Sequence, residues 1–173
     1  MTQEMKPEPT DMPSDPVAAL GFTPEALDTI EQLATALYAE GQLESALKLF
    51  QGLLVLRPDQ ADAWSAVGAV LTRMEQYEEA LPYLSAALAL DPDHTPALVT
   101  RAECLLALGQ AEAAAQDLDR AISLDPQEQD PAAHRARQLV LAMHTFFEEA
   151  HREGLDTVEV EETEEEGRVT SDE

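Results

Sequence analysis

The chain has 173 residues, 45% of them apolar but only 5% aromatic, a composition of packed Ala-rich and Leu-rich helices that predicts one all-α domain without sheets. Its formal charge is −25, from 35 acidic and 10 basic side chains, which excludes nucleic acid as a partner because phosphate binding needs a basic surface. A single cysteine excludes a disulfide framework, and no apolar run reaches the roughly 18 residues of a membrane span, so we expect a cytoplasmic protein without membrane insertion.

The two ends of the chain have the composition of disordered segments. Residues 1–16 contain four prolines among polar side chains, and residues 154–173 contain nine acids against Arg168. Neither segment offers enough apolar surface to offset the entropy of ordering, and like charges keep the second one extended. We therefore predict a disordered arm over 1–16, a folded domain over 17–153 and a disordered acidic tail over 154–173.

The folded domain contains an internal repeat with a period of 34 residues, marked by prolines that follow helical apolar runs. These are Pro58, Pro92 and Pro126, and the repeats that they frame are 27–60, 61–94 and 95–128. Each repeat has a small residue at position 8, alanine at position 20, and large apolar residues, Trp64 among them, at positions 4, 11 and 24. Small residues let two helices approach closely, and proline ends the second helix. Each repeat is therefore predicted to be a helix pair.

The second repeat carries the clearest resemblance to the tetratricopeptide repeat (TPR). The residues that match its pattern are Trp64, Val67, Gly68, Ala80, Ala87 and Pro92. Departures are Arg101 at a position that is usually Leu, Leu53 at one that is usually Ala, and Glu75 where the turn usually has Gly. The resemblance implies three helix pairs in a right-handed superhelix.

Two helix-start signals flank the repeats. Thr23 precedes Pro24, and Asp130 precedes Pro131, so that each proline stands at the first helical position after a capping side chain. The second signal predicts a capping helix over 131–153 that covers the exposed apolar end of the stack. Its predicted apolar set is Leu139, Ala142, Met143, Phe146 and Ala150.

No constellation in the sequence predicts catalysis, a cofactor or a metal site. His144, Glu148 and His151 share one face of the last predicted helix, but the polar face of an amphipathic helix explains them better than metal binding does. Cys104 has no basic neighbour in the sequence and is predicted to be a small core residue, and His94 is assigned only to solubility. We predict that the protein is not an enzyme.

The first helix of each repeat leaves one face toward the concave surface of the stack. At about 100° per residue, positions 4, 7, 8 and 11 pack against the partner helix, so positions 2, 5, 9, 12 and 13 face a groove. From these positions we predict a peptide-binding groove lined by Thr35, Tyr38, Ala39, Ser65, Ala69, Thr72, Arg73, Val99, Glu103 and Leu106. Among them Tyr38, Val99 and Leu106 are predicted to form shallow apolar sockets for an extended peptide.

Three strings within the repeats resemble a narrower family. They are LATALYAEGQLESALKLFQGLLVL, GAVLTRMEQYEEAL and AECLLALGQAEAA, and they look like the repeats of class II type III secretion chaperones of the LcrH/SycD kind. The resemblance implies a cytoplasmic chaperone that holds an extended segment of a secreted, hydrophobic translocator protein, with Tyr38, Ala69 and Leu106 as contacts. Fewer groove aromatics and a longer acidic tail depart from that family, so a generic TPR scaffold of a bacterial multiprotein assembly is the alternative. Whether the chain forms a homodimer is left open.

Overall fold

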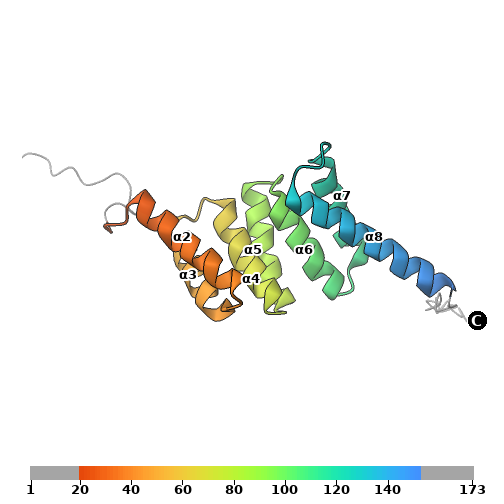
Figure 1. Cartoon of the computed structure of the whole chain (residues 1–173), viewed down its shortest axis with the longest axis horizontal. Helices are drawn as coiled ribbons and strands as arrows, with labels where there is room; N and C mark the ends of the chain where they lie inside the picture. The colour runs from red at the N-terminus through yellow and green to blue at the C-terminus, as the bar shows by residue number, and fades with distance from the viewer. Residues whose placement is uncertain (1–19, 153–173) are drawn as a thin grey trace, which may run out of the picture.

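The protein is built of α-helices throughout the part that the structure describes. The computed structural model describes residues 20–152, and these residues form seven helices and no strand. The helices are α2 (Pro24–Ala39), α3 (Leu43–Leu56), α4 (Ala61–Arg73), α5 (Tyr77–Leu90), α6 (Thr95–Ala107), α7 (Ala111–Ser123) and α8 (Pro131–Arg152). They follow one another along the long axis of the molecule (Figure 1). The all-α prediction is confirmed, whereas the predicted arm and acidic tail lie outside the described residues.

The helices pack as three pairs followed by a single helix. Helix α2 packs against α3, α4 against α5 and α6 against α7, each across a short turn. Successive pairs join through α3 and α4, α5 and α6, and α7 and α8. Helix α6, the first helix of the third pair, also contacts α4, the first helix of the second pair, and the single helix α8. This is the arrangement of three TPRs and a capping helix that the 34-residue period predicts.

The turn inside each pair uses the same left-handed backbone conformation. The φ angle is +80° at Gly41, +62° at Glu75 and +74° at Gly109, three positions that are 34 residues apart. Glycine adopts a positive φ without steric cost, whereas a residue with a side chain pays about 1–2 kcal/mol there. The departure at Glu75 therefore changes the energy of the turn and not its path.

Small residues bring the two helices of each pair together. Ala46, Ala80 and Ala114, which share position 20 of the repeat, are fully buried. In the second pair, a Cβ atom added at Gly68 would lie 2.6 Å from side-chain atoms of Leu84. Leu84 is itself fully buried and occupies the space that Gly68 leaves free. Gly68 thus sets the distance between α4 and α5.

Trp64 is a packed residue, as its position in the repeat predicts. Its ring packs against the core and lies 6.0 Å from the ring of Tyr83, centroid to centroid. Its Nε1 donates a hydrogen bond of 2.8 Å to the carbonyl oxygen of Pro58. The N–H of a partly buried indole usually finds such an acceptor. Trp64 therefore ties the start of the second repeat to the loop that precedes it.

Arg101 replaces the usual leucine by pairing with a carboxylate on the neighbouring helix. Its Nε and Nη2 atoms donate to the two carboxylate oxygens of Asp117, each at 2.7 Å. Asp117 is buried, and its hydrogen bond raises the pKa of Arg101 above the ordinary value although burial opposes this. A bidentate pair of this geometry satisfies both charges. Arg101 and Asp117 together thus replace an apolar contact between α6 and α7.

Both predicted helix starts have their caps. The Thr23 hydroxyl accepts a hydrogen bond of 3.2 Å from the backbone amide of Ala26, and Pro24 is the first residue of α2. At the start of α8, a carboxylate oxygen of Asp130 accepts a hydrogen bond of 2.8 Å from the amide of Ala132. These contacts satisfy amides that have no partner within the helix.

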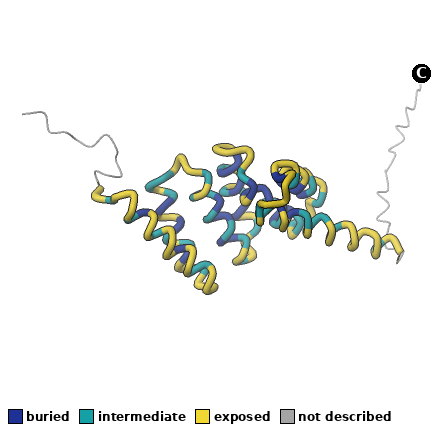
Figure 2. The backbone as a smooth tube through the Cα atoms, turned by 45° about the horizontal axis from the view of Figure 1, so that its top comes forward, coloured by how far each residue is buried: buried dark blue, intermediate teal, exposed yellow. Residues whose placement is uncertain are grey.

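Helix α8 packs against the core only as far as Met143. Ala133 and Ala136 are its buried residues, and the helix then continues past the repeats with an exposed surface (Figure 2). Leu139 and Met143 pack against the core as predicted, but Ala142 and Phe146 are exposed. The prediction that the whole apolar set packs is therefore wrong, because the stack ends before α8 does.

Candidate functional site

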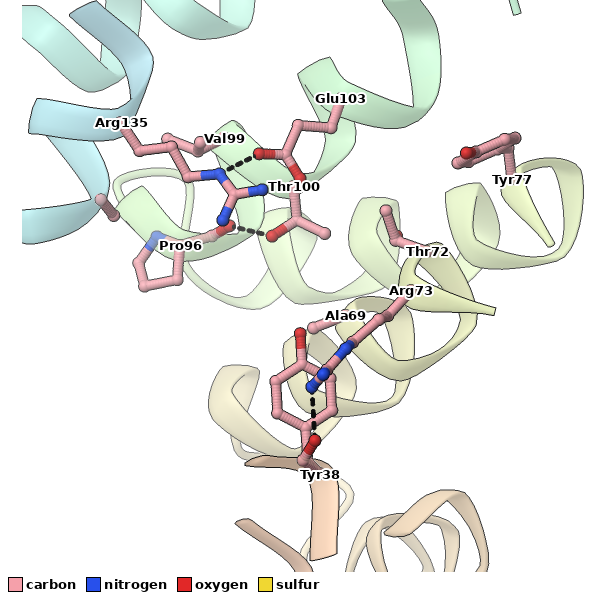
Figure 3. A pocket seen from close by; sticks show the side chains of 11 residues that line it. Tyr38, Ala69, Thr72, Arg73, Tyr77, Pro96, Val99, Thr100, Glu103 and Arg135 are labelled. Atoms are coloured by element: carbon pink, nitrogen blue, oxygen red, sulfur yellow. Dashed lines mark hydrogen bonds and ion pairs between the residues drawn. The ribbon is translucent and has the colours of Figure 1, made fainter. Parts of the chain in front are cut away.

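A groove opens between the first helices of the three repeats and the start of α8 (Figure 3). Its volume is about 590 Å³. The residues that line it are Tyr38 of α2, Ala69, Thr72 and Arg73 of α4, Tyr77 of α5, Pro96, Val99, Thr100 and Glu103 of α6, and Ala132 and Arg135 of α8. We call this cavity the groove. Its size lies within the range of pockets that bind ligands or peptide side chains.

Six of the ten predicted residues line the groove. They are Tyr38, Ala69, Thr72, Arg73, Val99 and Glu103. All six come from the first helices of the repeats, at positions 5, 9, 12 and 13, which are among the positions that helix geometry predicts.

The other four predicted residues lie elsewhere. Thr35 and Ala39 line a separate shallow hollow along α2. Ser65 is buried, and Leu106 is half-buried and packs against the core. Neither Ser65 nor Leu106 lines the groove, so the prediction of these two as groove residues is wrong. The first helices of successive repeats pack side by side and cover part of one another's surface.

Arg73 and Tyr38, which both line the groove, are in direct contact. The guanidinium carbon of Arg73 lies 4.8 Å from the centroid of the Tyr38 ring, and Arg73 also donates a hydrogen bond to the Tyr38 carbonyl oxygen. This stacking is a cation–π interaction. Tyr38 is therefore not the bare apolar socket that the sequence predicts, since a positive charge covers its ring.

Glu103 and Arg135 form an ion pair across the groove, from α6 to α8. The Glu103 side chain is mostly covered, whereas that of Arg135 is 64% exposed. The groove prediction includes Glu103 and misses Arg135, because it considers only three repeats. The positions Ala34, Gly68, Ala102 and Ala136 are 34 residues apart, and Ala136 is fully buried. Extending the period by one unit would have identified α8 as the first helix of a fourth, incomplete repeat.

The only cysteine of the chain, Cys104, contacts Thr72, one of the residues that line the groove. The Thr72 hydroxyl donates a hydrogen bond of 2.8 Å to the Gly68 carbonyl and lies 3.0 Å from the sulfur of Cys104. Cys104 is fully buried, and burial raises the pKa of its thiol above the ordinary value. A buried thiol with a raised pKa is a poor nucleophile. Cys104 is a core residue, as predicted.

His94 has a structural role that the sequence prediction missed. Its Nδ1 accepts a hydrogen bond of 3.1 Å from the amide of Ala97, which caps the start of α6. Its Nε2 lies 2.9 Å from a carboxylate oxygen of Asp62 on α4. The assignment of His94 to solubility alone is wrong, because its ring connects the second and third repeats.

The described residues contain no cluster of three or more His, Cys, Asp or Glu side chains that could hold a metal ion. On α8, the Nδ1 of His144 lies 3.4 Å from a carboxylate oxygen of Glu148, one turn further along the helix. Within residues 20–152, no helix has both the length and the apolar character needed to cross a membrane.

Residues 30–165 match the family described as the Cilia and flagella-associated protein 70 middle TPR-like domain. No curated protein matches the sequence.

Solved structures of bacterial secretion chaperones match most of the chain. The type III secretion translocator chaperone SycD from Yersinia enterocolitica is 27% identical, with a TM-score of 0.66 over 73% of this chain and 96% of SycD. PcrH, a protein of Pseudomonas aeruginosa, in complex with the chaperone binding region of PopB is 27% identical, with a TM-score of 0.62 over 68% and 97%. SycD in complex with a peptide of the translocator YopD is 25% identical, with a TM-score of 0.61 over 76% and 97%. The predicted resemblance to class II translocator chaperones is thus confirmed as a structural match.

Proposed function

Since the chain belongs to the family of the cilia and flagella-associated protein 70 middle TPR-like domain, a helical-repeat family, we propose a protein-binding function, that of a class II type III secretion chaperone. In this function the groove holds an extended segment of a hydrophobic translocator protein. The observation that carries the proposal is the match to SycD and PcrH over nearly their full lengths, including complexes with translocator segments.

The groove has the surface that an extended segment needs. Ala69 and Pro96 provide apolar wall beside the buried Val99, and Tyr38 and Tyr77 provide aromatic rings. Extended peptides bind such surfaces through a few side chains that enter apolar sockets. The three repeats and α8 all contribute, so the groove depends on the stacking of the whole domain.

The acidic character of the chain fits a chaperone for an aggregation-prone client. A client with membrane-inserting segments aggregates in water unless its apolar surface is covered. A highly charged partner keeps the complex in solution by self-repulsion between complexes. The charge of −25 would serve this purpose in the cytoplasm, before the client is exported, and the protein would have no catalytic turnover.

A scaffold that joins soluble proteins is the second candidate. The family match favours it, because the name of that family refers to a cilia and flagella protein and not to secretion. A scaffold would bind two soluble partners at once, whereas a chaperone would make one insoluble client soluble. The two functions therefore separate in a single co-expression test.

The test is co-expression of the full chain with a candidate translocator encoded beside its gene. We expect the translocator to be soluble and to co-purify with the wild-type chain. Tyr38→Ala should reduce its binding by about 1 kcal/mol or more, because aromatic anchors carry much of the energy of an interface. Glu79→Ala on the exposed face of α5 is the control and should bind as the wild type does. A translocator that stays insoluble with the wild-type chain would rule out the chaperone function.

A further inference from the structure

The arginines of residues 20–137 fall into two groups according to their partners. Most of them pair with a carboxylate of this chain: Arg57 with Asp28, Arg101 with Asp117, Arg120 with Asp93, Arg135 with Glu103, and Arg137 with Asp125. Within the described residues, the polar interactions of Arg73 are a cation–π contact with the Tyr38 ring and a hydrogen bond to the Tyr38 carbonyl oxygen. Acids outnumber bases 35 to 10 in this chain, yet Arg73, which lines the groove, has no carboxylate partner among the described residues.

The Arg73 side chain is held in place with most of its donors free. A guanidinium has five N–H donors in a planar fork, and the Tyr38 carbonyl accepts from one nitrogen of Arg73. The guanidinium carbon lies over the Tyr38 ring, 4.8 Å from its centroid, and this contact restricts the side chain before any segment binds, which lowers the entropy lost on binding. The fork geometry matches a carboxylate better than any neutral acceptor. Arg73 therefore has the properties of a prepared carboxylate-binding group.

The surroundings of Arg73 determine which residues can flank the acidic side chain in a bound segment. Ala69 stands one turn before Arg73 on the same helix, and Pro96 and Val99 line the facing wall of the groove. Glu103 also lines the groove, but its carboxylate is engaged by Arg135 and leaves Arg73 uncompensated. A bound segment thus meets a positive group and apolar wall side by side.

We infer that Arg73 is a specificity-determining residue of the groove, and that the segment it fits is an apolar extended segment with a single acidic side chain directed at Arg73. This inference rests on the proposed peptide-binding function. A single acid is specified because the rest of the chain is strongly negative. A polyacidic segment, such as residues 154–173 of this chain, would be repelled over the Debye length of about 8 Å at physiological salt.

The experiment uses a phage-displayed library of random linear peptides selected on the full chain. The same library is selected on Arg73→Gln, on Arg73→Lys and on Lys48→Gln, which removes one exposed positive charge from α3 outside the groove. We expect the wild-type chain and Lys48→Gln to enrich peptides with one Asp or Glu beside apolar residues. Arg73→Gln should lose that enrichment, and Arg73→Lys should keep part of it.

The selected peptide is then compared with its Glu→Gln or Asp→Asn counterpart by fluorescence polarisation. On the wild-type chain we expect the neutral peptide to bind about tenfold or more weakly, the scale of a hydrogen bond to a charged group. On Arg73→Gln the two peptides should bind equally. Circular dichroism and a thermal melt of each variant establish that the helices are intact.

Two results would overturn the inference in distinguishable ways. The role of Arg73 would be refuted if the selected peptides bind the wild-type groove without an acidic residue. It would also be refuted if neutralising the acidic residue lowers the affinity equally for the wild type and for Arg73→Gln. In both cases the peptide-binding function would stand. A library that yields no peptide, or only peptides that Tyr38→Ala binds unchanged, would refute the groove function and the inference together.

Discussion

Helices α6 and α2 hold the same place in the third and first repeats, yet they are buried to very different degrees. Seven residues of α6 are buried, against two of α2. Position 4 of the repeat is Leu98 at 2% exposure in α6 but the half-buried Ile30 in α2. Helix α6 packs against α4, α5, α7 and α8, whereas the main contact of α2 is with α3. In a linear stack, burial depends on the neighbours of a repeat more than on its own pattern.

The largest effect that this comparison predicts is a difference in stability between alanine variants of a central and a terminal leucine. Leu84 is fully buried in the middle of the stack, and Leu84→Ala should lower the free energy of unfolding by about 2–5 kcal/mol because it leaves a cavity. Leu33 on α2 is 53% exposed, and Leu33→Ala should change the same quantity by less than about 0.5 kcal/mol. Urea unfolding followed by circular dichroism measures both. Equal losses would contradict the difference between central and terminal repeats.

Overpacking of the central pair should have the next largest effect. Gly68→Leu must displace Leu84, which already fills the space a side chain would need, and should cost roughly 1–3 kcal/mol. Gly52 in α3 is the matched control, since nothing lies within 4 Å of a Cβ added there. Gly52→Ala should stabilise the protein by about 0.5–1 kcal/mol, because alanine is the better helix former. Thermal melts of the two variants should shift in opposite directions, and a melt of Gly68→Leu at the wild-type temperature would refute the close contact.

The turns within the three helix pairs allow a further comparison of the repeats, because they share a positive φ but not the same residue. Glu75→Gly gives the second turn the residue that the first and third already have, and should stabilise the protein by about 1 kcal/mol. Gly109→Ala should destabilise it by a similar amount, because it adds a Cβ at a positive φ. Chemical denaturation measures both changes. A loss of stability in Glu75→Gly would mean that the Glu75 side chain makes a contribution larger than the backbone cost.

The smallest effect concerns pH and the junction between α7 and α8. Burial of Asp125 raises the pKa of its carboxyl, but hydrogen bonds from the Gln129 and Asp130 amides and from Arg137 outweigh it and lower the pKa below the ordinary 3.8. The charged form is thus favoured in the folded state. Its contribution to stability is complete above pH 3.8 and is lost as the pH falls through the lower folded value. In Asp125→Asn, unfolding measured from neutral pH down to pH 3.8 and below should depend less on pH than in the wild type. An identical pH dependence would refute the role of Asp125.

Most of the fold follows from local pattern. Helix length follows from the 34-residue spacing and from the helix starts at Pro24 and Pro131. The close approach of the two helices in a pair follows from small residues such as Gly68. Both features are set by residues within one repeat. The ion pair of Arg101 is a feature that local pattern does not predict. The departure of Arg101 from leucine is visible in the sequence, but its pairing with Asp117 depends on how two helices face each other in the folded stack.

The groove was predictable in part for the same reason. Helix geometry places Ala69 and Glu103 toward the groove, because a repeat fixes which face of its first helix is open. It does not place Arg135, which reaches the groove only because α8 continues the stack. Nor does it predict that Arg73 covers the ring of Tyr38, since that contact joins side chains of two different repeats.

Cys104 is a built-in probe for the separation of the second and third repeats. It is the single thiol of the chain, it is fully buried, and it lies against Thr72 where the third repeat meets the second. A thiol reagent can therefore modify the folded protein only when these two repeats separate or the domain unfolds. At high reagent concentration the rate of modification becomes the rate of opening itself, and at low concentration it reports the population of the open form. One cysteine at this junction thus allows the kinetics of repeat separation to be followed without an added label.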